Sequence, residues 1–264
     1  GWGDNNYGRL GQNQGESDNS ANRSSPIQIP GTTWSTADRA LAAGQMGGFA
    51  IKTDGTLWTW GNNNYGNMGD NTTTRRSSPV QIPGTTWSKL SSAAYSTYAI
   101  KTDGTLWSWG YNRYGELGIN SMGTPQNVSN SRSSPTQIPG TTWNDIASGN
   151  YFAMATKTDG TLWTWGSGAD GRLGQNSTTF KSSPVQVGSG TDWATIVGER
   201  ESALAIKTDG TMWSWGNNVW GGLGLNEPSN TLISSPKQIP GTSWSTKKHH
   251  SGANNRGFAV IQET

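Results

Sequence analysis

The feature that most constrains this chain is an internal repeat with a period of about 50 residues. The segment Lys-Thr-Asp-Gly-Thr-(Leu/Met)-Trp-(Thr/Ser)-Trp-Gly occurs four times, beginning at Lys52, Lys101, Lys157 and Lys207. The segment Ser-Ser-Pro-x-Gln-(Ile/Val) occurs five times, with its proline at Pro26, Pro79, Pro135, Pro184 and Pro236. A repeat of this length indicates a supersecondary unit that buries its apolar surface only against its neighbours.

Each unit has the pattern of four short β-strands. In the second full unit we predict a strand over Tyr98–Thr102, a two-residue hairpin turn at Asp103-Gly104 that needs positive φ, and a return strand over Thr105–Trp109. After a Gly- and Asn-rich loop, two more strands are expected around 135–138 and 143–146. The chain shows no helical periodicity of useful length, so the fold class is all-β.

Tandem four-stranded units of this size predict a β-propeller that forms one domain over residues 1–264. The fifth unit is split between the chain ends, because Phe258-Ala259-Val260 matches Phe49-Ala50-Ile51 while Trp2-Gly3 matches Trp60-Gly61. We therefore expect five blades, with a ring closed by pairing of the N- and C-terminal strands, which would remove the exposed sheet edges. Five blades cut from a larger ring are the alternative.

The core of such a propeller must be aromatic. Leu, Ile, Val and Phe make up about one residue in seven, whereas the chain has 15 Trp and 37 Gly. So few aliphatic residues indicate disorder only when net charge is also high, and here it is +2. Because one Trp ring can bury about 150–250 Å², tryptophans at repeated positions can supply the missing core.

Composition also excludes several kinds of site and several classes of protein. The chain has no Cys, so disulfides, thiolate metal sites and cysteine nucleophiles are absent. No apolar run approaches the roughly 20 residues of a membrane span, so membrane insertion is not expected. The small net charge gives no signature of nucleic-acid binding. The start at Gly1-Trp2-Gly3 carries no signal segment and indicates a processed or trimmed chain.

Taken together, the repeated motifs resemble those of the regulator of chromosome condensation (RCC1) family. The best copies are Thr102–Gly118 with Pro135–Ile138, and Thr208–Gly224 with Pro236–Ile239, and the resemblance covers nearly the whole chain. It implies a β-propeller. The founding member is a seven-bladed guanine nucleotide exchange factor that binds a small GTPase and chromatin, while other members are inhibitors, adhesive proteins or parts of scaffolds. This chain has five units, no basic tail and no wedge-like insertion, which argues against exchange activity.

Candidate binding residues lie in the loop after each Trp-x-Trp-Gly strand. An aromatic ring beside asparagine and glycine could cover the apolar face of a sugar or a peptide side chain, while the amides bind polar groups. The alternative is that each ring packs its own loop onto its blade. The residues in this pattern are Tyr7, Asn63, Tyr65, Asn112, Tyr114, Asn218 and Trp220.

Catalytic, metal and cofactor sites are not predicted. The segment Gly166–Gly171 matches the dinucleotide fingerprint but opens no helix, so it lacks the phosphate site. His249 and His250 are adjacent, point to opposite faces of a strand, and would not chelate one metal together. Asp54 and its three counterparts begin Asp-Gly turns, and no nucleophile has a histidine partner. We therefore expect no enzyme.

The function that follows is a non-enzymatic recognition module that binds a protein or glycan through its blade loops, in an extracellular or virion setting. Loops of unequal length on a rigid scaffold are where recognition sits. One alternative is a structural brick or decoration domain that assembles into a larger particle. The other is a GTPase partner of the exchange-factor type.

Overall fold

The computed structural model describes residues 1–14, 22–123 and 130–246. It contains four sheets of four strands each, and each sheet is one blade. The strands are β1 (Leu41–Gly44), β2 (Gly47–Ile51), β3 (Leu57–Gly61) and β4 (Arg76–Ile82); β5 (Trp87–Ser92), β6 (Ser96–Lys101), β7 (Leu106–Gly110) and β8 (Arg132–Gln137); β9 (Trp143–Gly149), β10 (Phe152–Lys157), β11 (Leu162–Gly166) and β12 (Lys181–Gln186); and β13 (Trp193–Gly198), β14 (Ser202–Lys207), β15 (Met212–Asn217) and β16 (Leu232–Gln238).

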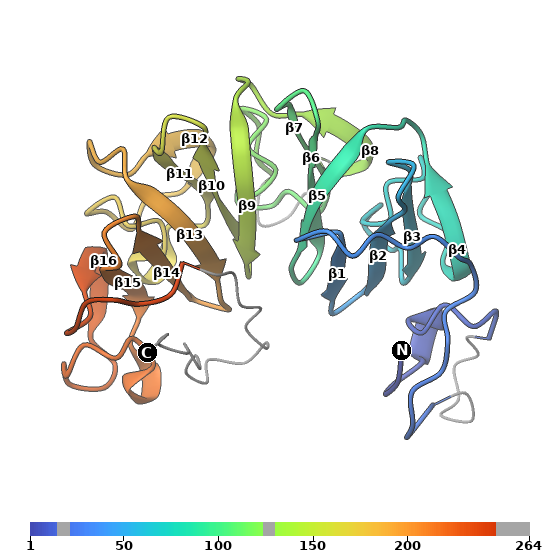
Figure 1. The fold of residues 1–264 in the computed structure, drawn as a ribbon, viewed down its shortest axis with the longest axis horizontal. Coiled ribbons are helices and arrows are strands. Elements are labelled where there is room, and N and C mark those ends of the chain that lie inside the picture. The colour runs from blue at the N-terminus through green and yellow to red at the C-terminus, as the bar shows by residue number, and fades with distance from the viewer. Residues whose placement is uncertain (15–21, 124–129, 247–264) are drawn as a thin grey trace.

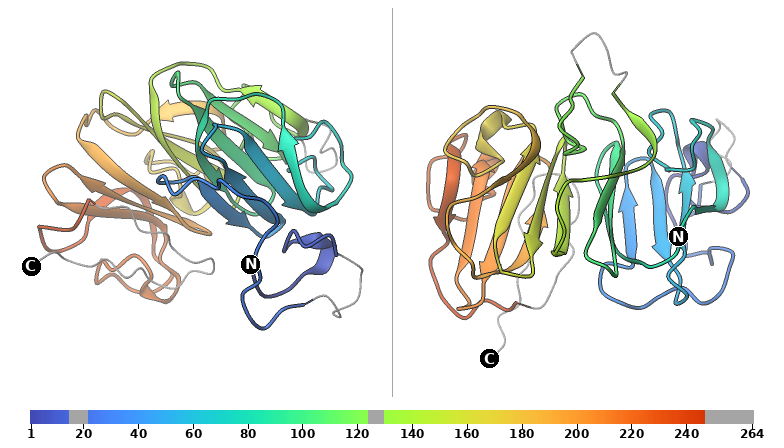
Figure 2. Two further views of the ribbon diagram at one scale, coloured as in Figure 1. Left: turned by 45° about the vertical axis from the view of Figure 1, so that its right-hand side comes forward. Right: turned by 90° about the horizontal axis from the view of Figure 1, so that it is seen from above.

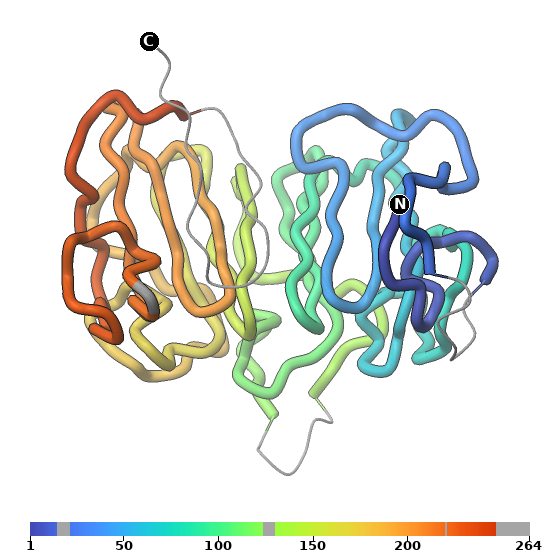
Figure 3. Tube along the Cα trace, turned by 90° about the horizontal axis from the view of Figure 1, so that it is seen from below, coloured from blue at the N-terminus to red at the C-terminus, as the bar shows by residue number. Residues whose placement is uncertain are grey.

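The four blades follow one another along an arc (Figure 1) and each is an antiparallel meander in sequence order. Two further views show the blades stacked face against face (Figure 2). The first strand of each blade lies beside the first strand of the next, so β1, β5, β9 and β13 line the axis (Figure 3). The all-β propeller architecture is thus confirmed. None of the helical turns in the described residues is long and apolar enough to span a membrane.

Three of the four predicted strands match β6, β7 and β8 within a few residues. The fourth, predicted around 143–146, is β9, the first strand of the third blade, so the predicted unit is shifted by one strand from the blade. The turn of the hairpin between β6 and β7 differs from the predicted one. Of Asp103 and Gly104, only Gly104 has positive φ, and the Lys101 N–H donates to the Thr105 carbonyl across a three-residue turn. Asp103 is held by accepting the Thr105 N–H and hydroxyl, at 2.9 and 2.7 Å. The prediction of a two-residue turn was therefore wrong, because the aspartate side chain caps the turn instead of entering the left-handed region.

The core lies between blades, as the tryptophan spacing predicts. The second tryptophan of each Trp-x-Trp-Gly segment is buried, with Trp109, Trp165 and Trp215 fully enclosed. Each lies against the tryptophan that starts the first strand of its own blade; Trp87 and Trp109, for example, are 6.1 Å apart in an edge contact. One apolar cluster joins Phe49 and Leu57 of the first blade to Trp87 and Trp109 of the second. Stacking of blades therefore buries what one sheet could not.

A fifth unit is represented by its second half. Gly3 and Arg23 form a bridge in the register that joins Gly61 to Arg76 in the first blade, so the described residues 1–14 and 22–29 repeat the third and fourth strand positions. The predicted strand at Phe258–Val260 lies outside the described residues. No sheet joins the two ends of the described chain, so the structure contains four complete blades and the closed five-blade ring stays a prediction.

One side chain crosses the axis of the arc. Arg39, just before β1, places its Nε 2.6 Å from Oδ1 of Asp145 on β9 and donates from Nη2 to the carbonyl of Ile196 on β13, at 2.8 Å. Asp145 is almost fully buried. The first blade is therefore held directly to the third and fourth across the centre, beside a cavity of about 370 Å³ lined by first strands of all four blades.

Candidate functional site

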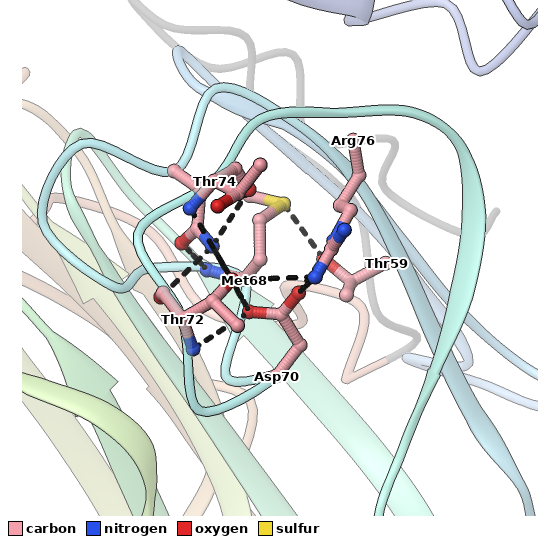
Figure 4. A network of polar contacts seen from close by, with 7 residues as sticks. Thr59, Met68, Asp70, Thr72, Thr74 and Arg76 are labelled. Atoms are coloured by element: carbon pink, nitrogen blue, oxygen red, sulfur yellow. Dashed lines mark hydrogen bonds and ion pairs between the residues drawn. The ribbon is translucent and has the colours of Figure 1, made fainter.

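The loop between the third and fourth strand of a blade is built around one buried asparagine. In the first blade, Asn63 accepts the Met68 N–H at 2.9 Å and donates to Oδ1 of Asp70 and to the carbonyls of Thr72 and Thr74, each at 3.0 Å. Figure 4 shows this network, in which Asp70 also pairs with Arg76. One amide therefore satisfies several backbone groups that the irregular loop leaves unpaired.

The same arrangement recurs in other blades. Asn112 accepts the Leu117 N–H at 3.0 Å and donates to the Ser121 carbonyl at 2.9 Å. Asn218 accepts the Leu223 N–H at 3.1 Å and donates to the Pro228 carbonyl at 3.0 Å. All three predicted asparagines are at most 1% exposed. Their buried amides hold the loops through these hydrogen bonds.

Two predicted rings, Tyr65 and Tyr114, belong to a larger aromatic assembly on the edge of the blades that carries these loops. We call this edge the loop face; it also holds the turns between the first and second strands. Five of the seven tyrosines of the chain gather there with one phenylalanine. This tyrosine cluster comprises Tyr65, Tyr95, Tyr111, Tyr114, Tyr151 and Phe180, and its members come from three neighbouring blades.

The rings of the tyrosine cluster form one continuous chain of contacts. Tyr65 meets Tyr111 at 4.9 Å between centroids, Tyr95 stacks on Tyr151 at 6.1 Å, and Tyr114 joins Tyr151 at 5.1 Å. Phe180 ends the chain, 5.3 Å from Tyr114 and 43% exposed. Mostly edge-on contacts of this kind suit aromatic packing and make the surface rigid. A rigid aromatic patch that stays partly exposed is a typical binding surface.

Three cations lie on the loop face that carries the tyrosine cluster, with Arg132 and Lys181 at the starts of β8 and β12. The Arg113 guanidinium lies 5.1 Å from the Tyr114 ring centroid. Within the described residues Arg113, Arg132 and Lys181 form no ion pair. Glu116 lies beneath the rings, fully buried, with one carboxyl oxygen accepting the Tyr114 N–H at 2.6 Å. Burial raises the pKa of Glu116 to about 8, so at neutral pH this carboxyl is largely uncharged.

The remaining predicted site residues lie elsewhere. Tyr7 is half-buried in the N-terminal half-unit, with the Arg75 guanidinium 4.2 Å from its ring centroid. The backbone of Trp220 lies in the short turn η4 (Val219–Gly221), and its side chain lies outside the described part of the structure. Neither Tyr7 nor Asn218 belongs to the tyrosine cluster, so the structure divides the predicted set between blades.

Sequence reasoning missed four members of the cluster. Tyr95 and Tyr151 occupy the same place in the turn between first and second strands, so a comparison of these turns across units would have singled them out. Tyr111 replaces an asparagine of the first blade, Asn62, and Phe180 immediately precedes β12. Tyr111 and Phe180 gave no sequence signal, because only the stacking of blades brings Tyr111 to Tyr65 and Phe180 to Tyr114.

The repeated aspartates act as turn caps. Asp54, Asp103, Asp159 and Asp209 each accept the N–H and hydroxyl of the threonine two residues on. These hydrogen bonds lower the pKa of each carboxyl. The dinucleotide-like segment ends in the three-residue turn η3 (Ala169–Gly171), and η1 (Asn6–Gly8) is its counterpart near the N-terminus.

The chain matches the family model described as the regulator of chromosome condensation (RCC1) repeat. The matched residues are 54–100, 103–156, 159–197 and 209–254. A second model of the same repeat matches residues 39–67, 87–116 and 143–172.

Solved structures agree in fold. Human WBSCR16 superposes with a TM-score of 0.72 at 19% identity, over 92% of this chain and 63% of that one. Yeast RCC1 (Prp20), solved bound to Kap60, superposes with a TM-score of 0.72 at 18% identity, over 84% of this chain and 52% of that one. Prp20p from Saccharomyces cerevisiae, described with its binding to Gsp1p and histones, superposes with a TM-score of 0.71 at 18% identity, over 84% of this chain and 54% of that one. This chain thus spans between about half and two thirds of their lengths.

Proposed function

The chain belongs to the family of regulator of chromosome condensation (RCC1) repeat proteins, and from this premise we propose that it is a non-enzymatic interaction module that binds a protein ligand on its loop face. The observation that carries the proposal is the tyrosine cluster. Tyrosine is enriched where proteins bind one another, because its ring offers a large contact area at low conformational cost. Six rings from three blades, ending in the exposed Phe180, form such an anchor.

The surrounding charge supports a ligand that carries carboxylates. Arg113 lies beside the Tyr114 ring, and Arg132 and Lys181 begin β8 and β12 on the same loop face. None of the three forms an ion pair among the described residues, and buried Glu116 is largely neutral. A ligand segment with an apolar or aromatic side chain between acidic residues would satisfy both the rings and the cations. Gsp1p, named with the solved yeast relative, is a protein ligand to test first.

The experiment selects dodecapeptides from a random display library on the immobilised protein and measures binding of the enriched peptides by fluorescence anisotropy. We expect the double variant Tyr65→Ser with Phe180→Ser to lose about tenfold or more in affinity, since buried aromatic anchors contribute about 2 kcal/mol or more each. The matched control is Tyr7→Ser, which removes the equivalent loop tyrosine outside the cluster. Equal binding by wild type and double variant would place the site elsewhere.

A charge variant tests the acidic character of the ligand. Substituting Arg113, Arg132 and Lys181 by glutamine should weaken binding and flatten its dependence on salt, because exposed charge pairs are screened. Arg75→Gln is the control, since Arg75 of the first blade also lies over a tyrosine, but over Tyr7, which is outside the cluster. A glycan array and a nucleotide-release assay on small GTPases test the other candidate functions. A glycan ligand, an extracellular or virion setting and assembly into a larger particle stay predictions from the sequence.

A further inference from the structure

The edge of the blades opposite the loop face carries a repeated donor. We call this edge the turn face; it holds the Asp-Gly turns between second and third strands and the connections from each fourth strand to the next blade. Among the described residues, one tryptophan per unit has its indole nitrogen buried without a hydrogen-bond partner; these are Trp34, Trp87, Trp143, Trp193 and Trp244. Because buried donors are nearly always paired, a donor repeated in this state indicates a binding role.

In the second and third blades a lysine ammonium lies beside this indole N–H. A Cβ atom on Gly84 would lie 3.6 Å from Nε1 of Trp87 and 3.9 Å from Nζ of Lys101. Trp87 is 3% exposed, whereas Gly84 is exposed to solvent. A neutral donor and a cation therefore converge beside a surface glycine. The third blade repeats the arrangement at Gly140, with Nε1 of Trp143 at 3.6 Å and Nζ of Lys157 at 3.8 Å.

The lysines of these two blades are held by aromatic rings. Nζ of Lys101 lies 4.7 Å from the ring centroid of Trp87 and 4.4 Å from that of Trp107. Within the part of the chain that the structure describes, neither Lys101 nor its counterpart at 157 forms an ion pair. The nearby carboxylate of Asp103 instead accepts the N–H and hydroxyl of Thr105. The three N–H donors of each ammonium can thus serve an anion.

The fourth blade shows which anion fits this position. Asp192 replaces Thr142 of the third blade, and its Oδ1 lies 3.2 Å from Nζ of Lys207. The point where a Cβ atom on Gly190 would lie is 3.2 Å from that oxygen and 3.3 Å from Nε1 of Trp193. The chain thus places its own carboxylate between indole and ammonium in one blade, at the point that borders an exposed glycine in the second and third.

A groove between the second and third blades connects their two sites. This cavity of about 470 Å³ is lined by Lys101 of one site and by Trp143 of the next. Lys89 also lines it and donates to the carbonyl of Asn144 across the two blades. Asp103 contributes one carboxylate, already engaged by its own turn. An extended segment in this groove would therefore reach both sites.

We propose that the turn face binds an acidic peptide segment, with one side-chain carboxylate at the second-blade site and another at the third-blade site. At each site the indole N–H donates to a carboxylate oxygen and the lysine ammonium pairs with it, as Lys207 pairs with Asp192. Hydrogen bonds to a charged acceptor are stronger than neutral ones, and two sites on one ligand reinforce each other. The chain thus has a second binding face, independent of the tyrosine cluster.

The test follows the indole N–H signals of the isotope-labelled protein by NMR, assigned through single Trp→Phe variants. Sodium acetate or a hexaglutamate peptide replaces sodium chloride at constant ionic strength. We expect saturable shifts of the Trp87 and Trp143 signals. The Trp107 signal is the internal control, because its indole N–H already donates to Thr105 at 2.9 Å.

Two lysine variants are matched controls for each other. Lys101→Gln should abolish the shift of Trp87 and keep that of Trp143, and Lys157→Gln should do the reverse. The wild type should bind hexaglutamate about tenfold or more tightly than acetate, and either variant should lose this gain, because it depends on two linked sites.

The fourth blade provides a gain of binding. The Trp193 signal should not respond in the wild type, and Asp192→Ala should make it respond to acetate, because the internal carboxylate is removed. No shift of Trp87 and Trp143 with either probe, or a response to inorganic phosphate without one to acetate, would overturn the proposal. The double variant Tyr65→Ser with Phe180→Ser should keep these shifts, so this proposal and the loop-face proposal fail separately.

Discussion

Trp109 on β7 donates its indole N–H to the carbonyl oxygen of Asn67 at 3.0 Å, across the boundary between the first and second blades. The indole ring itself is fully buried. One side chain thus provides both apolar burial and a directed bond between blades. The equivalent pair recurs at each described boundary, so the propeller is held by a repeated tryptophan contact instead of an aliphatic core.

Removing this side chain should be costly. Trp109→Ala is expected to lower the free energy of unfolding by about 3–5 kcal/mol, because a large buried side chain leaves a cavity. Trp109→Phe should lose less, since the ring is partly kept while the bond to Asn67 is lost. Urea denaturation of both variants, with half-buried Trp107→Ala as comparison, provides the measurement. A loss below about 1 kcal/mol for Trp109→Ala would contradict the core assignment.

The buried asparagines are expected to determine stability. Asn63→Ala leaves the Met68 N–H and the carbonyls of Thr72 and Thr74 without their partner, which should cost about 1–3 kcal/mol. Asn64→Ala is the matched control, because Asn64 is the exposed neighbour in the same loop. Equal thermal midpoints for the two variants would mean that the amide network does not hold the loop.

Stability should fall as pH rises toward the alkaline side of neutrality. Burial raises the pKa of Glu116 to about 8 and that of Glu199 to about 7, from an ordinary value of 4.5. Between about pH 4.5 and 8 the folded chain therefore binds more protons than the unfolded chain, so the free energy of unfolding decreases with pH across that window. Glu116→Gln should make this decrease smaller while leaving the value near pH 4.5 almost unchanged. Denaturation midpoints from pH 4.5 to 9 would check it, and identical slopes for both proteins would refute it.

The ion pair across the axis offers a test of coupling between distant blades. Arg39→Ala should cost about 3–5 kcal/mol, because it leaves Asp145 buried without its guanidinium partner. Adding Asp145→Ala should recover part of that loss, which a double-mutant cycle measures directly. Additive losses would show that the two side chains do not interact energetically.

Much of the fold follows from local chemistry that a sequence displays. Asp103-Gly104 marks the hairpin and Trp107 and Trp109 mark the returning strand, because turn and strand preferences act over a few residues. The conformation of that turn could not be predicted from the sequence, because whether Asp103 enters the left-handed region depends on its hydrogen bonds to Thr105. Similarly, Tyr65 was identified beside Asn63, but the amide network that holds Asn63 became visible only in three dimensions.

The repeat by itself determined the four-stranded unit, the tryptophan core and the family of this protein. The tertiary structure decided which side chains meet. Tyr95 and Tyr151 are far apart in sequence and reach each other because successive blades are rotated about one axis. Arg39 and Asp145 meet for the same reason, across that axis. Local patterns set the shape of one blade, whereas the angle and spacing between blades come from how their faces pack, and only that packing assembles a surface from three of them.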